Sequence, residues 1–207
     1  MVEPSRDAPA RTPVLPGPLP GLPPVPPPSL DPVLDAAATC FVRYGVRRTS
    51  VQDVARVLGV NRTTVYRQAG NVEQMALLLA VRDTHRMLAT LPLRIGRPVD
   101  PSGLVDLVAT VVAQARAHPV LAKVLADERD LIGSLLAGDA ARLINRISAA
   151  LTPLLTAAMR AGQLATGDPE LLAEWLVRVA TSLVLVEPRC GDRAFLGELL
   201  IPALTPR

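Results

Sequence analysis

Polar and apolar residues follow a helical period through most of the chain, most clearly in residues 49–71. Four apolar side chains there recur at the i, i+3, i+4, i+7 spacing of one helix face: Val51, Val54, Ala55 and Leu58. Gly59 breaks this pattern, and Asn61 offers a side-chain oxygen that can cap a second helix beginning at Arg62. Two short helices joined by a turn with glycine predict a helix-turn-helix, whose second helix enters the DNA major groove.

A further helix is predicted before this motif. The Asp-Pro pair at residues 31–32 is typical of a helix N-cap and first position, and Gly45 is expected to end the helix. Its buried stripe is predicted to comprise Leu34, Ala37, Ala38, Phe41 and Val42. Thr49 and Gln52 have the spacing of a capping box, and Thr49 or Ser50 can serve as a cap, as a phosphate ligand, or as both.

Longer helical patterns follow the motif and are separated by Pro and Gly. A helix from Val72 is expected to be ended by Pro92 and the segment 96–101, and Gly138 and Pro153 are expected to interrupt or kink a later one. The further predicted helices span residues 102–118, 119–125, 131–160, 169–187 and 193–203. Because no region shows the period-2 alternation of a strand, the predicted fold is all-α.

Three segments are predicted from these patterns. Residues 1–29 form a Pro-rich extension, expected to be disordered or polyproline II, with docking to a partner domain as an alternative to a bare tether. Residues 30–76 form a three-helix DNA-binding domain. Residues 77–207 form a larger helical domain for effector binding and dimerisation.

Charge is concentrated on the predicted DNA-binding domain. Between Asp31 and Val72, six arginines face three aspartates, so this segment carries the whole formal net charge of +3. The arginines are Arg43, Arg47, Arg48, Arg56, Arg62 and Arg67. Such clustering is typical of a phosphate-binding face, although a solvated arginine-rich surface is the alternative. Only 2% of residues are aromatic, so the core must be aliphatic.

Other functional classes find little support. Cys40 and Cys190 lack metal-ligand spacing and are expected to be buried free thiols, as in a reducing cytosol. The longest uncharged stretch, residues 12–30, is too rich in proline to span a membrane, and no secretory signal is evident, so a cytoplasmic location is expected. His85 and His118, the two histidines, belong to no catalytic constellation. Neither enzymatic activity nor a cofactor or metal is expected.

The run from Phe41 to Met75 resembles the N-terminal domain of the TetR family of bacterial transcriptional regulators. The matching positions are Phe41, Gly45, Thr49, Val51, Val54, Ala55, Gly59, Val60, Thr64, Tyr66 and Asn71, in register and without a gap. The resemblance covers roughly residues 31–80. The rest of the chain is similar only in its helical pattern and length.

The resemblance implies that the first turn of the second motif helix reaches base edges and that Tyr66 bonds a phosphate. Arg62 is the best candidate for bidentate recognition of guanine. The family resemblance and the charge pattern together give the predicted DNA-binding residues: Arg47, Arg48, Thr49, Ser50, Gln52, Asn61, Arg62, Thr63, Thr64, Tyr66 and Arg67. Gln68 and Ala69 replace the family's His-Phe pair, and Val72 replaces its phosphate-binding lysine, so weaker packing and one lost phosphate contact are expected.

The remaining expectations concern the second domain. The resemblance implies a pocket for a small, apolar effector, and polar residues on apolar faces are its candidate lining: Arg82, His85, Trp175, Arg178 and Thr181. Two consecutive apolar helices at the C-terminal end predict a homodimer interface built from Leu172, Trp175, Leu176, Val179, Leu183, Phe195, Leu196, Leu199 and Leu200.

Two functional hypotheses follow. The first is a ligand-responsive dimeric regulator, a repressor that leaves a palindromic operator when the effector binds. The alternative is a helical interaction or adaptor protein that retains the fold with weak or no specific DNA binding.

Overall fold

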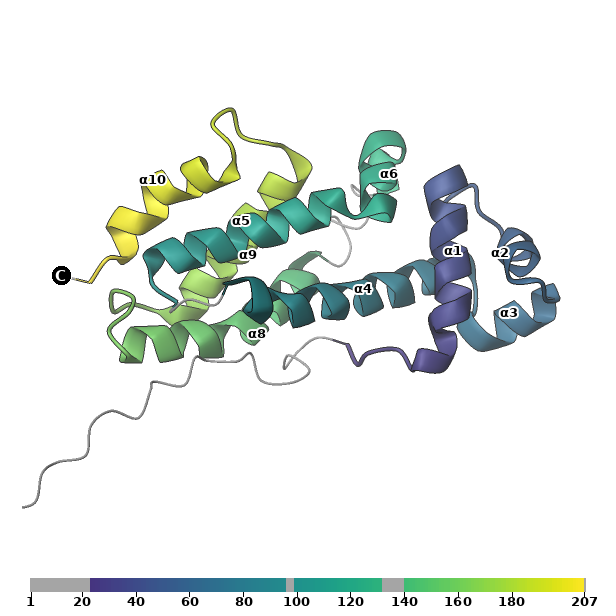
Figure 1. The fold of residues 1–207 in the computed structure, drawn as a ribbon, viewed down its shortest axis with the longest axis horizontal. Coiled ribbons are helices and arrows are strands. Elements are labelled where there is room, and N and C mark those ends of the chain that lie inside the picture. Colours follow the sequence, from purple (N-terminus) through teal and green to yellow (C-terminus); the bar gives the residue numbers. More distant parts are fainter. Residues whose placement is uncertain (1–22, 96–98, 132–139, 207) are drawn as a thin grey trace, which may run out of the picture.

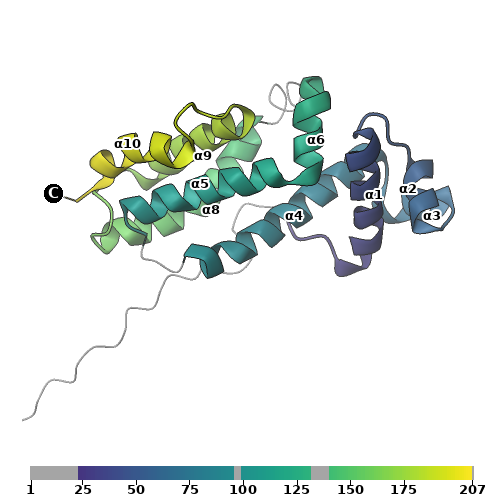
Figure 2. The ribbon, with the colours of Figure 1, turned by 45° about the horizontal axis from the view of Figure 1, so that its top comes forward.

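The computed structural model describes residues 23–95, 99–131 and 140–206, and these are helical without any strand (Figure 1). The helices are η1 (Pro28–Leu30), α1 (Asp31–Tyr44), α2 (Val51–Leu58), α3 (Arg62–Ala69), α4 (Val72–Ile95), α5 (Pro101–Ala117), α6 (Pro119–Asp127), α8 (Ala140–Arg160), α9 (Pro169–Leu185) and α10 (Asp192–Leu204). In both ribbon views α1, α2 and α3 lie at one end of the molecule, and α4 leads from them to the remaining helices (Figures 1 and 2). The predicted all-α fold is confirmed.

A first hydrophobic core joins α1, α2, α3 and the beginning of α4. Leu34 and Phe41 of α1, Val54 of α2, Val65 of α3 and Met75 of α4 are fully buried in it. These residues recur at the helical spacing predicted for the inner face of each helix. The core therefore fixes α3 with one side inward and leaves its other side free.

A second core lies among the C-terminal helices. Helix α5 packs against α4, α9 and α10, and α8 packs against α9. The core is almost wholly aliphatic, as the low aromatic content requires; its fully buried members include Leu104, Leu155, Leu164, Leu176 and Leu196. Helix α10 is also attached to α5 by ion pairs, Arg116 with Asp192 at 2.8 Å and Arg193 with Asp106 at 2.6 Å.

Several predicted helix ends differ from the structure. Asp31 is not the N-cap of α1 but its first residue, because η1 leads directly into the helix through Leu30. Pro92 does not end α4, which continues to Ile95, the residue before the segment 96–101 that is also predicted to end it. By contrast, the Asp168 carboxylate caps α9 as predicted, accepting hydrogen bonds from the amides of Glu170 and Leu171 at 2.9 and 3.1 Å.

The N-terminal extension is partly ordered. Residues 1–22 lie outside the described part of the chain, as does Gly138. The segment 23–27 approaches α4: Pro26 is buried, and the His85 ring nitrogen Nε2 lies 2.9 Å from the carbonyl oxygen of Pro23. Of the two expected conformations, Pro27 has the φ of −61° and ψ of 143° typical of polyproline II, and η1 follows it directly.

Cys40 is a buried free thiol as predicted, and burial raises its pKa. Cys190 is exposed, contrary to expectation, because it lies in the connection between α9 and α10 rather than within a helix. Among the described helices none alone has the length and apolar character to cross a bilayer; α5 and α6 meet that test only as a pair bent by 71°.

Candidate DNA-binding interface

Helix α2 begins with a capping box centred on Ser50. The Asp53 amide donates to Ser50 Oγ at 3.2 Å, and the Ser50 amide donates to Asp53 Oδ2 at 3.0 Å. Hydrogen bonds from the Ser50 hydroxyl and amide lower the pKa of the Asp53 carboxyl. The predicted capping pair Thr49–Gln52 is thus one residue out of register, and Gln52 remains exposed.

Thr49 is only 6% exposed, and its hydroxyl donates to the carbonyl oxygen of Gly45 at 2.6 Å. Its predicted contact with DNA is therefore unsupported, because the side chain closes the loop between α1 and α2 from inside. The neighbouring residues Arg47, Arg48 and Ser50 are exposed. These three are the part of the loop that faces solvent.

Helix α3 is presented as the sequence predicts. Asn61 is its N-cap, and its Oδ1 accepts hydrogen bonds from the amide and hydroxyl of Thr64 at 2.8 and 2.9 Å. This second bond occupies the Thr64 hydroxyl. Buried Val65 and Ala69 hold the inner side of the helix. The outer side carries the exposed residues Arg62, Thr63, Tyr66, Arg67 and Gln68.

The arginines of this end are free to bind an external anion. Among the described residues, Arg47, Arg48, Arg62 and Arg67 form no ion pair within 4 Å, whereas Arg56 pairs with Asp53 at 2.9 Å. Arg43 is exposed and lies over the Tyr44 ring, 5.2 Å from its centroid. Unpaired exposed cations around a capped helix with one polar face are the features expected of a phosphate-binding surface.

The corner between α3 and α4 contains the departures from the family pattern. Ala69 is buried in the first core, and Val72 is half-buried at the start of α4. The corner has its own reciprocal capping: the Gln74 amide donates to Asn71 Oδ1 at 2.8 Å, and the Asn71 amide donates to Gln74 Oε1 at 2.9 Å. Two hydrogen bonds thus fix the start of α4.

Sequence analysis missed the contacts that join this end to the other helices. Glu128, just after α6, accepts hydrogen bonds from the amides of Val46 and Arg47, both at 2.8 Å. His118, between α5 and α6, places Nε2 at 3.0 Å from Asp83 Oδ2 on α4. Neither pairing has a local sequence signal, since 82 and 35 residues separate the partners Val46–Glu128 and Asp83–His118.

The predicted effector-lining set is not brought together. Arg82 lies 2.7 Å from Asp35 and 2.8 Å from Asp83, so its charge is used between α1 and α4. His85 approaches Pro23, as described above. On α9, Trp175 and Arg178 are exposed, Arg178 pairs with Glu174 at 2.6 Å, and the Thr181 hydroxyl donates to the Val177 carbonyl oxygen. The sequence could not show how α4 and α9 are rotated relative to each other.

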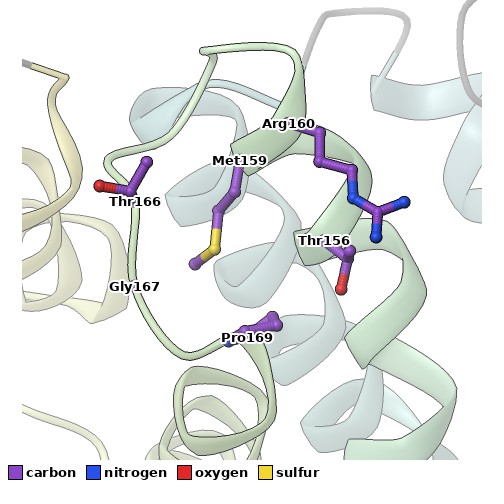
Figure 3. Close-up of a pocket in the computed structure, with 6 residues that line it drawn as sticks. All are labelled: Thr156, Met159, Arg160, Thr166, Gly167 and Pro169. Atoms are coloured by element: carbon purple, nitrogen blue, oxygen red, sulfur yellow. The ribbon is translucent and has the colours of Figure 1, made fainter.

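The structure instead contains a pocket of about 250 Å³ between the end of α8 and the start of α9 (Figure 3). Its lining residues are Thr156, Met159, Arg160, Thr166, Gly167 and Pro169. The Met159 side chain points into the space enclosed by the loop that carries Thr166 and Gly167 (Figure 3). None of the predicted effector residues belongs to it.

The predicted dimer residues divide into three groups by exposure. Leu176, Leu183, Leu196 and Leu200 are buried in the second core, so they stabilise the single chain. Leu172 and Val179 are half-buried. The exposed members are Trp175, Phe195 and Leu199, and the structure adds exposed Leu171, Leu185 and Val186. An apolar surface therefore remains on α9 and α10, although it is shifted from the predicted one.

A helix-turn-helix on a three-helix core, with an exposed basic recognition helix and a separate helical body, defines a DNA-binding transcriptional regulator. Residues 33–79 match the family model for bacterial regulatory proteins of the tetR family. The HTH-type transcriptional regulator Mb2274c of Mycobacterium bovis is 30% identical over 154 residues, which cover 73% of this chain and 78% of that protein. The chain belongs to the TetR family.

Two further proteins extend the similarity. The HTH-type transcriptional regulator AlkX of Mycobacterium tuberculosis is 27% identical over 178 residues, or 82% of each chain. The crystal structure of the TetR family repressor AlkX from Dietzia sp. strain DQ12-45-1b shares the fold, with a TM-score of 0.62 at 23% identity, covering 83% of this chain and 94% of that one. The family resemblance is confirmed, and these relatives are named as transcriptional regulators.

Proposed function

We propose that the protein is a dimeric repressor that binds a palindromic operator through α3 and the loop before α2. The observation that carries this proposal is the set of exposed arginines around a capped α3 that form no ion pair with another described residue. In the proposed complex Arg62 and Thr63 contact base edges in the major groove. Thr64 orients the helix start through its bond to Asn61, so it contributes indirectly.

The phosphate contacts are proposed to surround this helix. Tyr66, 58% exposed, is proposed to bond a backbone oxygen. The Ser50 hydroxyl donates to Asp53 Oδ2 at 2.6 Å, so Ser50 is proposed to contribute indirectly, by capping α2. Arg47 and Arg48 add charge from the loop, and Arg67 extends the basic face along α3. Gln52 and Asn61 remain members of the proposed interface by exposure, whereas Thr49 is left out of it because it is buried.

Dimerisation is proposed to use the exposed apolar residues of α9 and α10. Leu171 and Trp175 are one helical turn apart on α9, and Phe195 and Leu199 are one turn apart on α10. We propose that the two pairs together form the interface of a two-fold dimer, in which the same residues of both protomers meet. A two-fold dimer would present two recognition helices to the two half-sites of a palindrome.

The effector is proposed to be small and apolar. This rests on the almost wholly aliphatic second core and on the relatives: the Dietzia AlkX repressor is described as implicated in biodegradation of n-alkanes. Long-chain aliphatic compounds are therefore the first probes to test.

We propose residues 30–76 and 77–207 as the DNA-binding and effector-binding domains, with their boundary inside α4.

The deciding experiment measures binding of the protein to its own upstream DNA at two salt concentrations. Salt-sensitive and sequence-selective binding, with selectivity relaxed in Arg62→Ala by a factor of about 5 to 150, supports the repressor. Arg146→Ala is a matched control, since this exposed arginine lies on α8. Equal, weak binding to all sequences would refute the repressor and favour the adaptor alternative.

A further inference from the structure

Glu128 joins the end of α6 to the loop between α1 and α2. It follows α6 directly and is only 8% exposed. Its Oε2 accepts a hydrogen bond from the backbone amide of Val46, and its Oε1 accepts one from the backbone amide of Arg47, each at 2.8 Å. One carboxylate thus holds two consecutive amides of the loop between α1 and α2, which carries the exposed arginines Arg47 and Arg48.

The loop is shaped to admit this carboxylate. Gly45 precedes the two bonded amides and has φ +88°, a conformation that favours glycine. A Cβ atom at this position would lie 2.9 Å from Glu128 Oε1, closer than side chains approach one another. Both the backbone conformation and the space at residue 45 therefore suit the contact with Glu128.

The start of α6 is attached to α4. His118 caps α6, with its Nδ1 3.4 Å from the Leu121 amide, while Nε2 lies 3.0 Å from Asp83 on α4. Between these ends Val124 is buried in the first core. Helix α6 thus contacts the DNA-binding domain at its middle and its end, and at its start it contacts α4 at Asp83, beyond residue 76, although the domain prediction places α6 with the body.

We propose that Glu128 is a positioning residue for DNA binding: its carboxylate holds the loop 45–50 in the conformation that presents Arg47, Arg48 and the start of α2 to phosphates. The proposal rests on the proposed function, because it presumes that this loop contacts DNA. Glu128 itself does not touch DNA. It acts through the hydrogen bonds that it accepts from the two backbone amides.

Electrostatics alone predicts the opposite effect. Glu128 is an anion near a phosphate-binding surface, so removal of its charge should strengthen DNA binding if charge were its only influence. If the carboxylate positions the loop, its removal lowers the population of the binding-competent conformation and weakens binding by the same factor. The sign of the change therefore separates the two effects.

The test compares Glu128→Gln with Asp127→Asn in the full-length protein. Asp127 is the neighbouring exposed carboxylate; it pairs with Lys123 at 2.6 Å and accepts no hydrogen bond from the loop among the described residues. E128Q is expected to bind operator DNA about tenfold more weakly. D127N is expected to bind equally or slightly more tightly. E128D, which keeps the charge but is one methylene shorter, is expected to weaken binding like E128Q.

Amide hydrogen exchange at Val46 and Arg47, measured by NMR without DNA, provides the independent readout. Exchange should accelerate in E128Q and stay unchanged in D127N. Unchanged DNA affinity in E128Q despite faster exchange would overturn the proposal, as would equal weakening in both variants. Loss of helical circular dichroism in E128Q would also overturn it, because Glu128 would then support the fold as a whole. If wild-type protein shows no selective binding, the proposed function fails, and the exchange data still report whether Glu128 holds the loop.

Discussion

Arg82 links α1 to α4 and gives the sharpest stability prediction. Its side chain is 5% exposed and donates to Asp83 at 2.8 Å, to Asp35 at 2.7 Å and to Asp31 at 3.3 Å. Replacement by methionine keeps the apolar stem but removes every one of these bonds. Three carboxylates would then remain without their shared cation.

The expected cost follows from the exposure of each partner. Asp35 is 64% exposed, so its pair contributes only about 0.5 kcal/mol after solvent screening. Asp83 is 19% exposed, and loss of a charge-assisted bond to a buried carboxylate costs about 2–3 kcal/mol. The long bond to half-buried Asp31 adds little. We therefore expect R82M to lower the free energy of unfolding by about 3 kcal/mol at neutral pH.

The assay is urea denaturation followed by circular dichroism, at one fixed protein concentration because a dimer gains stability by mass action. Arg86→Met is the matched control. Arg86 pairs with Asp31 at 3.0 Å but is 54% exposed, so about 0.5 kcal/mol or less is expected. A loss below about 1 kcal/mol in R82M, or equal losses in the two variants, would refute the burial argument.

The same cluster predicts a dependence on pH. Burial opposes ionisation of Asp83, but hydrogen bonds from His118 and Arg82 outweigh it and lower the pKa of this carboxyl. A lowered pKa in the folded state contributes stability above the unfolded value of about 3.9, and this stability is lost as pH falls through the folded pKa. The difference between wild type and R82M should therefore shrink below about pH 4.

Three further predictions concern other parts of the molecule. Gly59→Ala should lower the free energy of unfolding by about 1–2 kcal/mol in thermal melts, because Gly59 has φ +74°. The cost is conformational, since no atom lies within 4 Å of a Cβ placed there. An unchanged stability would contradict the left-handed turn. Tyr66→Phe should weaken binding to all DNA sequences by a similar factor of about 3 to 10 without changing selectivity, and a change in base preference would speak against a phosphate contact. Leu199→Glu should shift sedimentation toward monomer without loss of helicity, whereas an intact dimer would exclude α10 from the interface.

The DNA-binding end could be predicted closely because its signals are local. Helix α2 is bounded by Val51 and Leu58 in both prediction and structure, and Asn61 caps α3 as expected. Each depends on residues within one or two helical turns, where spacing alone determines the geometry. The error at Thr49 is also local: Ser50 and Asp53 have the same capping spacing one residue later, and burial of Thr49 in the loop decides between them.

Contacts between distant segments could not be predicted in this way. Arg82 lies on an apolar helix pattern, and the sequence offers no means of distinguishing an effector ligand from a partner for Asp35, 47 residues earlier. Helices α4 and α9 each pack against α5, so their rotation relative to each other depends on contacts between distant segments, and the sequence could not show which of the predicted effector residues face a common cavity. Glu128 illustrates the same limit, because its role depends on a loop 81 residues away.

These long-range contacts hold α1 at both ends, and this constrains how a signal can reach the recognition helix. Arg82 on α4 binds Asp31 and Asp35 near the start of α1, whereas Glu128 after α6 holds the loop at its end. Movement of α4 alone would pull one end of α1 while the other stayed fixed, so α1 would tilt rather than translate. Because α2 and α3 share one core with α1, a tilt of α1 would carry the recognition helix with it. Any movement of α4 caused by an effector would therefore depend on Glu128 as its fixed point, and E128Q should also reduce the effect of any effector on DNA affinity.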